Sequence, residues 1–215
     1  MSASGPFVHL HNHTHYSLLD GCAKPARAAA RAKELGMPAL AMTDHGNLFG
    51  AIDFYRSCKK GGIKPLIGCE LYYVNDHKQN ERPRRERKRT DDIGDIPEDY
   101  VPSPEDFPKF QIHHKGVIAK DFEGYQNLCN LVSDAHLNGV YYKPRTDIEK
   151  LAQYSKGLIG FSGCINGVAA QYLIYGDEAN ARRVTADFVD VFGKENYFIE
   201  LQDHGMPVQR RIIPG

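Results

Sequence analysis

Histidines alternate with other residues near the start of this chain, at His9, His11, His13 and His15. They continue an apolar run over residues 7–10, which predicts a short strand. Alternate side chains of a strand point to the same face, so the first three imidazoles would share one side. Imidazole is a common ligand of divalent transition metals, and the ligands of one ion must converge. The pattern therefore predicts one wall of a metal site.

Metal-capable side chains also lie at the ends of the later predicted strands. Apolar runs predict those strands at residues 39–43, 65–74, 111–119, 157–162 and 196–201. Helical patterns lie at residues 25–35, 48–60, 121–137, 147–154 and 178–192. This alternation predicts βα units with a parallel sheet or barrel, whose active sites form where the strands end. The donors near these ends are Asp20, Asp44, His45, Cys69, Glu70, His113, His114, Cys164, Glu200, Asp203 and His204.

Several of these donors have structural alternatives that the sequence leaves open. Asp44 can also cap the next helix, and a lone cysteine such as Cys164 can be a small buried apolar residue. His113 and His114 point to opposite faces of a strand, so at most one of them should be a ligand. A carboxylate directed into a barrel is costly unless it is paired or metal-bound, which favours a ligand role for Glu70.

The mixture of imidazole, carboxylate and thiol donors constrains the metal. Such a set favours zinc, manganese or iron over magnesium, which prefers oxygen ligands. The number of donors exceeds the needs of one ion, so two or three divalent ions are expected. Clustered divalent ions support hydrolysis of a phosphate ester, because one ion activates water while the others bind phosphate oxygens. The donor set therefore predicts a metal-dependent phosphoesterase.

Composition is typical of a soluble cytoplasmic protein. The 215 residues are 41% hydrophobic and 25% charged, with 27 basic and 27 acidic residues. This balance gives no overall basic excess for nucleic acid, so any such contact must be local. The five cysteines are scattered without a CxxC pair, which argues against a disulfide framework and a zinc finger. We see no signal peptide and no apolar run that could span a membrane.

One charged segment interrupts the alternation of strands and helices. Residues 75–110 contain a basic stretch over 82–89 and then an acidic, proline-dotted stretch. We interpret this segment as an insertion in a single domain that covers residues 1–215. The basic stretch could contact a phosphate backbone, or its charge could be neutralised by the acidic half.

The chain resembles the PHP (polymerase and histidinol phosphatase) family. The resemblance rests on His11-x-His13-Thr14, on Thr43-Asp44-His45-Gly46, on the strand-borne Glu70, and on His114 and Cys164. Longer stretches are similar to the branch of this family found at the N-terminus of bacterial replicative DNA polymerases. These stretches are residues 13–21, 41–50, 68–70, 141–145, 162–164 and 200–205.

This resemblance implies a distorted seven-stranded βα barrel, similar to a TIM barrel, with up to three metals at its mouth. The ligands that it implies are His11, His13, Asp20, His45, Glu70, His114 and Cys164. The family's last metal motif, an Asn-Asp-x-His-type strand end, would follow beyond Gly215. We therefore expect a fragment of the PHP domain, truncated before its last strand and two further ligands, and without the polymerising parts.

Two functions follow from the resemblance. The first is metal-dependent 3′–5′ exonuclease proofreading, and the retained ligand residues favour it. The second is a scaffold that stabilises the polymerase and docks a separate proofreading subunit. The polymerase-like stretches count against a stand-alone small-molecule phosphatase. Expected partners are DNA, the rest of the polymerase subunit, the sliding clamp and the proofreading subunit. His204 and Arg145 are candidates for phosphate contact, with surface roles as the alternative.

Overall fold

The computed structural model describes residues 6–75, 78–81, 104, 107 and 111–214. The insertion predicted at 75–110 therefore lies mostly outside the described residues. The helices are α1 (Pro25–Glu34), α2 (Ala51–Gly61), α3 (Phe122–Asn138), α4 (Ile148–Tyr154), α5 (Val168–Ile174), α6 (Glu178–Phe192), the 3₁₀ turn Lys194–Asn196 and α7 (Pro207–Ile212). The strands are β1 (Ala39–His45), β2 (Lys64–Val74), β3 (Ile112–Ala119), β4 (Val140–Tyr141), β5 (Lys143–Thr146), β6 (Leu158–Phe161) and β7 (Tyr197–Phe198).

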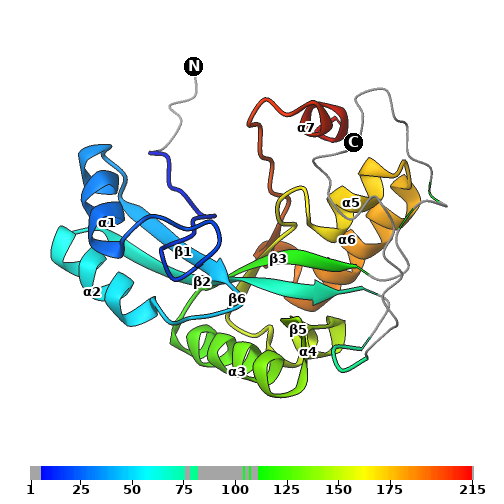
Figure 1. Ribbon diagram of the computed structural model, residues 1–215, viewed down its shortest axis with the longest axis horizontal. Coiled ribbons are helices and arrows are strands. Elements are labelled where there is room, and N and C mark those ends of the chain that lie inside the picture. Colours follow the sequence, from blue (N-terminus) through cyan, green and yellow to red (C-terminus); the bar gives the residue numbers. More distant parts are fainter. Residues whose placement is uncertain (1–5, 76–77, 82–103, 105–106, 108–110, 215) are drawn as a thin grey trace.

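Strand β2 is the centre of a single mixed sheet (Figure 1). One edge of β2 pairs in parallel first with β1 and then with β5, while the other edge pairs with β3. Strand β3 runs antiparallel to both β2 and β6, and β6 pairs in parallel with β7. The mixed α/β class is therefore confirmed, but the all-parallel arrangement is wrong for β3. An antiparallel neighbour needs no helical crossover, and the sequence predicts no helix between β2 and β3.

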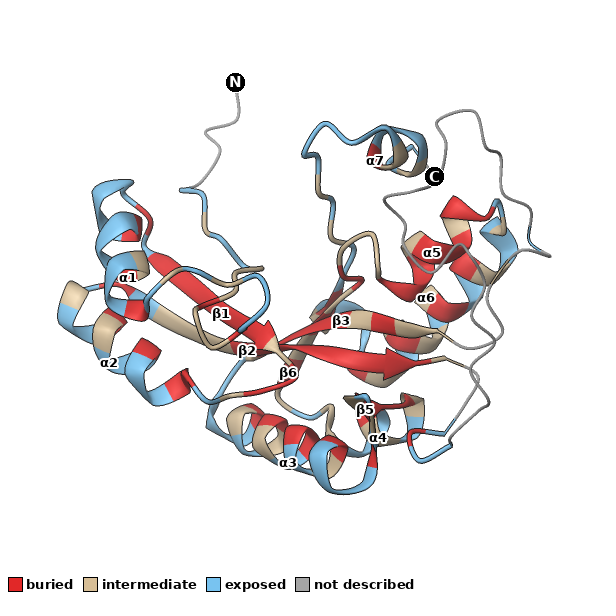
Figure 2. Cartoon of the chain, in the orientation of Figure 1, coloured by how far each residue is buried: buried red, intermediate tan, exposed pale blue. Residues whose placement is uncertain are grey.

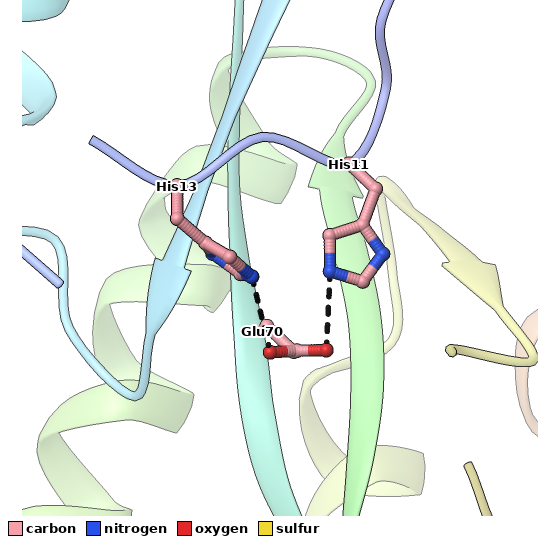
Figure 3. Close-up of side chains that lie close together, drawn as sticks. All are labelled: His11, His13 and Glu70. Atoms are coloured by element: carbon pink, nitrogen blue, oxygen red, sulfur yellow. Dashed lines mark ion pairs between the residues drawn. The ribbon is translucent and has the colours of Figure 1, made fainter. Parts of the chain in front are cut away.

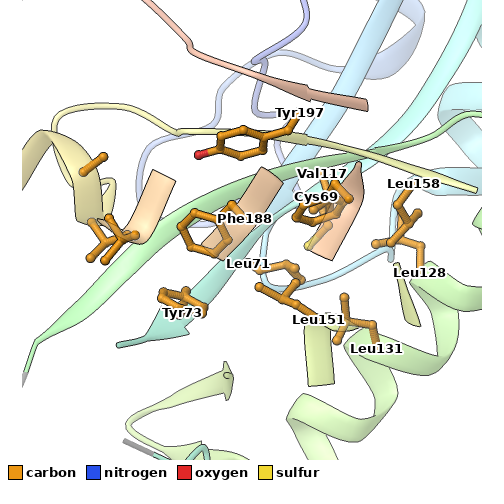
Figure 4. Close-up of a cluster of buried hydrophobic side chains, with 14 of the residues drawn as sticks. Cys69, Leu71, Tyr73, Val117, Leu128, Leu131, Leu151, Leu158, Phe188 and Tyr197 are labelled. Carbon is orange, nitrogen blue, oxygen red and sulfur yellow. The ribbon is translucent and has the colours of Figure 1, made fainter. Parts of the chain in front are cut away.

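The two faces of β2 have different roles because side chains alternate along a strand. Cys69, Leu71 and Tyr73 are buried in a cluster with residues of α3, α4 and α6 (Figure 4). A second cluster packs Met42 of β1 against α1 and α2. Glu70 lies between two core residues of β2 and points to the opposite face. The central strands are buried, while the outer faces of the helices are exposed (Figure 2).

Local sequence signals explain where the helices begin. The carboxylate of Asp121 accepts a hydrogen bond from the backbone N–H of Gly124, and Asp147 and Asp177 cap α4 and α6 in the same way. The predicted helices at 25–35, 121–137, 147–154 and 178–192 are thus confirmed to within a residue or two. No helix in the described part of the chain is long and apolar enough to cross a bilayer.

The segment predicted as the first strand has no regular strand structure. It is extended, and it lies along β1 through two backbone hydrogen bonds, from Ala41 to His9 and from Thr43 to Asn12. Two bonds do not make a continuous ladder, so the segment is free to turn at Thr14. His9 is exposed, so only His11 and His13 of the predicted row face the centre of the molecule. Within the described residues, no strand pair closes the sheet into a barrel.

Candidate metal centre

Glu70 faces the imidazoles of His11 and His13 (Figure 3), and the imidazoles of His45 and His114 also contact it. Its Oε1 is 3.1 Å from Nε2 of His11 and 3.1 Å from Nδ1 of His114. Its Oε2 is 3.5 Å from Nε2 of His13 and 2.6 Å from Nδ1 of His45. The Glu70 side chain is only 1% exposed, whereas these four imidazoles are 17–20% exposed. The carboxylate therefore forms the floor of a shallow site whose rim is made of histidines.

The remaining two predicted ligands lie on either side of this group. Asp20 Oδ2 is 2.8 Å from Nε2 of His45, and the Asp20 side chain is half exposed. The Sγ of Cys164 lies 3.7 Å from Glu70 Oε1 and 3.7 Å from His114 Nδ1. Three overlapping sets of donors result, each within 4.8 Å: His11, His13 and Glu70; His13, Asp20 and His45; and His45, Glu70 and His114. The structure thus brings all seven predicted ligands to one place.

A buried carboxylate holds the histidine-bearing loop in position. Asp44 accepts hydrogen bonds from the backbone N–H and the hydroxyl of Thr14 and from the hydroxyl of Ser17. The alternative in which Asp44 caps the next helix is wrong, because α2 begins after Gly50 without a side-chain cap. Asp44 and His45 are neighbours on β1, so their side chains point in opposite directions. Asp44 points to the loop, and His45 points to Glu70.

Strand alternation separates the two adjacent histidines of β3, as predicted. His114 faces Glu70, whereas His113 is 1% exposed on the opposite face and stacks against Phe107. Burial is the main cause that lowers the pKa of His113 to about 3. His113 is therefore a neutral core residue and does not belong to the metal centre.

Cys164 reaches the group because Gly163 allows a sharp turn after β6. Gly163 has a φ of 89°, and a side chain there would lie 2.6 Å from the carbonyl oxygen of His114. Burial and the charge of Glu70 raise the pKa of the Cys164 thiol to about 12. A thiol in this position is protonated unless a cation is bound.

Glu200 is a member of the group that the sequence analysis did not select as a ligand. Its Oε1 lies 2.7 Å from Nδ1 of His11, and Gln202 donates to the same oxygen. The backbone N–H of Glu200 donates to the hydroxyl of Ser162, which positions the segment after β7. The signal was present, because Glu200 lies at the end of a strand predicted at residues 196–201, as the chosen residues lie at or near strand ends. Glu200 and Cys164 also border a cavity of about 700 Å³ between α5, α6 and the segment that includes α7.

Charge interactions within the group are strong. Burial alone would lower the pKa of His11, but hydrogen bonds to Glu200 and Glu70 outweigh it and raise the pKa to about 10. Burial opposes ionisation of Glu70, yet contacts with His11 and His114 hold its pKa well below the usual range. Burial and the neighbouring His45 lower the pKa of His13. Without a metal, contacts with His11, His114 and His45 stabilise the charged form of the Glu70 carboxylate.

The two predicted phosphate contacts lie elsewhere. Arg145 is fully buried, and its guanidinium donates to the backbone carbonyls of Gly139, Gln79 and Glu81. This side chain supports the fold and is not placed to contact a substrate. His204 is exposed, and its backbone N–H donates to Gln209. His204 is absent from all three donor sets.

The PHP-domain family profile matches residues 9–204, a range that contains every residue of this cluster. This chain belongs to the PHP family. It is 44% identical over 212 residues to the DNA polymerase III subunit alpha of Deinococcus radiodurans, covering 97% of the chain and 14% of that protein. It is 40% identical over 214 residues to the corresponding subunit of Saccharopolyspora erythraea, covering 98% of the chain and 17% of that protein. The chain thus spans about a sixth of the length of these relatives.

A solved structure shows the same fold as this PHP domain. It is the crystal structure of a candidate metal-dependent phosphoesterase from Bifidobacterium adolescentis, with a TM-score of 0.51. The match covers 96% of this chain and 82% of the other, at 13% sequence identity. At that identity the likeness concerns the fold alone.

Proposed function

We propose that this PHP domain is a metal-dependent phosphoesterase that holds two or three divalent ions of zinc, manganese or iron. The proposed ligands are His11, His13, Asp20, His45, Glu70, His114 and Cys164, with Glu200 beside them. The observation that carries the proposal is the convergence of four imidazoles on the one buried carboxylate of Glu70. Glu70 is the residue that could bridge two ions.

The spacing of the donor atoms fits ligands of common ions. Ligand bonds of 2.0–2.2 Å place neighbouring donors of one ion about 3 to 3.5 Å apart. The contacts of Glu70 with His11, His114 and His13 are 3.1, 3.1 and 3.5 Å. The 2.6 Å between Nδ1 of His45 and Oε2 of Glu70 is shorter than this range, as expected for an ion pair between the two side chains.

Outer hydrogen bonds orient the proposed ligands. Nδ1 of His13 donates to the backbone carbonyl of Thr43 at 2.8 Å, which leaves Nε2 to face Glu70. Glu200 contacts Nδ1 of His11 in the same manner, so Nε2 of His11 points inward. Such contacts fix the tautomer and the direction of a metal-binding imidazole. When bound, divalent ions would supply an activated water and neutralise phosphate oxygens.

We propose DNA as the substrate, with removal of a nucleotide from a 3′ end during replication. The similarity to DNA polymerase III alpha subunits over 97–98% of the chain supports this choice. In this role the domain would act on the 3′ end as part of a polymerising subunit, beside the sliding clamp and the proofreading subunit. A closed barrel of the PHP type is part of the same proposal.

A non-catalytic scaffold is the second candidate, because large apolar side chains are exposed in the segments next to Asp20 and His45. Leu18 and Leu19, in the loop before Asp20, are 90% and 91% exposed, and Phe49 is 73% exposed. Large exposed apolar side chains are typical of surfaces that contact other proteins. In this reading the domain docks a separate proofreading exonuclease, and any metal is structural.

Measurement of metal content together with 3′ nucleotide release distinguishes the two functions. The 215-residue chain is loaded with manganese or zinc and incubated with a mismatched primer–template. We expect release of 3′ nucleotides, and loss of both bound metal and release in His11→Ala and His13→Ala. His9→Ala is the matched control, because His9 is exposed and outside the donor sets. Release that persists in both variants would assign the activity to a contaminant, and metal binding without release would favour the scaffold.

A further inference from the structure

The turn between β4 and β5 presents an aromatic side chain in an unusual backbone conformation. Tyr142 has a φ of 62°. In the described part of the chain, every other residue with a positive φ is a glycine. Its side chain is 75% exposed, so burial does not compensate for this conformation. Non-glycine residues in left-handed conformations gather at functional sites, where the surrounding structure holds them.

The next residue, Lys143, extends toward the metal centre. Its Nζ lies 5.0 Å from the centre of the Tyr72 ring. Tyr72 shares a face of β2 with Glu70, and its ring centre is 6.0 Å from that of His45 and 5.7 Å from that of His114. Lys143 is therefore separated from the proposed ligands by a single aromatic ring.

The ammonium group of Lys143 is available for an anionic ligand. Among the described residues, no carboxylate lies within ion-pair distance of Lys143, while the carboxylates of Glu70 and Asp20 are paired with histidines. A lysine that rests on an aromatic face keeps its donors directed outward. The chemistry that fits such a group beside a phosphoesterase centre is a phosphate of the substrate strand.

Neighbouring contacts hold this turn in place. The guanidinium carbon of Arg145 lies 5.2 Å from the centre of the Tyr141 ring, and Arg145 also donates to the carbonyl of Gly139 before β4. The Tyr141 ring in turn contacts the Tyr142 ring edge-on, with 4.7 Å between centres. Pairing of β5 with β2 fixes the turn relative to Glu70. A ligand that meets this surface would therefore need little rearrangement of the protein.

We propose that Lys143 and Tyr142 bind a single DNA strand beside the metal centre. Lys143 contacts a phosphate of the strand, and the exposed ring of Tyr142 stacks on a base. Stacking on aromatic rings combined with cationic contacts is a general way to bind single strands without sequence preference. The choice of DNA rests on the proposed function. The pair also provides the phosphate contact that the sequence analysis assigned to Arg145 and His204.

Binding of a fluorescein-labelled oligo-dT strand to the zinc-loaded 215-residue chain tests this proposal. Lys143→Met keeps the length of the side chain and removes its charge, and Tyr142→Asn removes the ring while tolerating a positive φ. We expect Kd to rise about fivefold and about tenfold, respectively, and the salt dependence to weaken for Lys143→Met by about 0.7 in log–log slope. Lys59→Met and Tyr55→Ala, on the exposed side of α2, are the controls and should leave Kd unchanged.

A second substrate separates failure of this proposal from failure of the proposed function. Bis(p-nitrophenyl) phosphate reports on the metal centre itself, and the wild type, Lys59→Met and Tyr55→Ala should hydrolyse it at the same rate. KM for the oligonucleotide should rise only in Lys143→Met and Tyr142→Asn. If the wild type hydrolyses neither substrate, the proposed phosphoesterase fails, and the binding measurement still decides the role of the turn. A Kd within twofold of wild type for both variants overturns the proposal and would indicate a turn that docks protein.

Discussion

Asp44 holds Thr14 through both of its carboxylate oxygens, although 30 residues separate the two positions. Oδ1 accepts from the backbone N–H of Thr14 at 2.6 Å, and Oδ2 accepts from the Thr14 hydroxyl at 2.7 Å. The pair joins the end of β1 to the turn that follows His11 and His13. The position of these two imidazoles therefore depends on a carboxylate that lies outside the three donor sets of the structure.

Replacement of Asp44 by asparagine should weaken both the fold and the metal centre. Asparagine keeps the volume but replaces one acceptor by a donor, which would face the N–H or hydroxyl groups of Thr14 and Ser17. An unsatisfied buried group of this kind costs about 3 kcal/mol. Urea unfolding and elemental analysis measure the two effects. Asp53→Asn, on the exposed side of α2, is the control, and equal stability of the two variants would contradict this role of Asp44.

Glu70→Gln should remove bound metal and leave the chain folded. The amide keeps the shape of the side chain but has no charge and only one acceptor oxygen, so ions that share the carboxylate lose their common ligand. We expect bound zinc, measured by elemental analysis after gel filtration, to fall to less than half of the wild-type content. The matched control is Glu149→Gln, whose side chain is 68% exposed. Undiminished zinc in Glu70→Gln would rule out a central role for this carboxylate.

Acid should destabilise the chain through His113, which the fold keeps neutral. Its pKa is about 3 in the folded chain and about 6.5 when unfolded, so the unfolded chain binds the proton more readily. The free energy of unfolding therefore falls as pH decreases below 6.5, by about 2 kcal/mol between pH 6.5 and 5. The range from pH 6.5 to pH 5 lies above the ordinary pKa of carboxyl groups.

His113→Leu isolates this effect, because leucine is apolar and does not titrate. Urea unfolding of chelator-treated protein at pH 6.5 and at pH 5 gives the loss for each chain. We expect the loss in the variant to be smaller by about 2 kcal/mol. The same loss in both chains would show that other groups are responsible for the acid sensitivity.

The start of α3 should tolerate no side chain at Gly124. A Cβ there would lie 1.8 Å from the carbonyl oxygen of Gly157, which also accepts from the backbone of Lys120. Gly124→Ala must displace the helix and should cost about 3 kcal/mol or more. Gly61→Ala is the comparison, because its Cβ would meet only Ala29 and Ile63 at 3.9–4.0 Å. Thermal unfolding of both variants measures the difference, and a similar melting temperature would contradict it.

Helix limits and the faces to which strand side chains point were accessible from the sequence because each depends on a local signal. The aspartate before α3 and the alternation along β2 predict a cap and the direction of Glu70 without knowledge of distant contacts. His114 was separated from His113 by the same alternation.

The errors concern residues whose role depends on the tertiary structure. The side chain of Arg145 is buried by segments that pack over it from other parts of the chain, so its neighbours in sequence do not reveal its role. The direction of β3 depends on which edge of β2 it joins. Glu200 carried the same signal as the chosen donors, and only the contact with His11 distinguishes it.

The contact between His11 and Glu200 joins positions 189 residues apart. A ribosome makes His11 189 residues before Glu200, so this contact cannot form until synthesis has passed Glu200. Closure of so long a loop is also entropically unfavourable until the intervening strands are paired. The final orientation of the His11 imidazole would therefore be set only after the segment that carries Glu200 has been made and folded against the sheet.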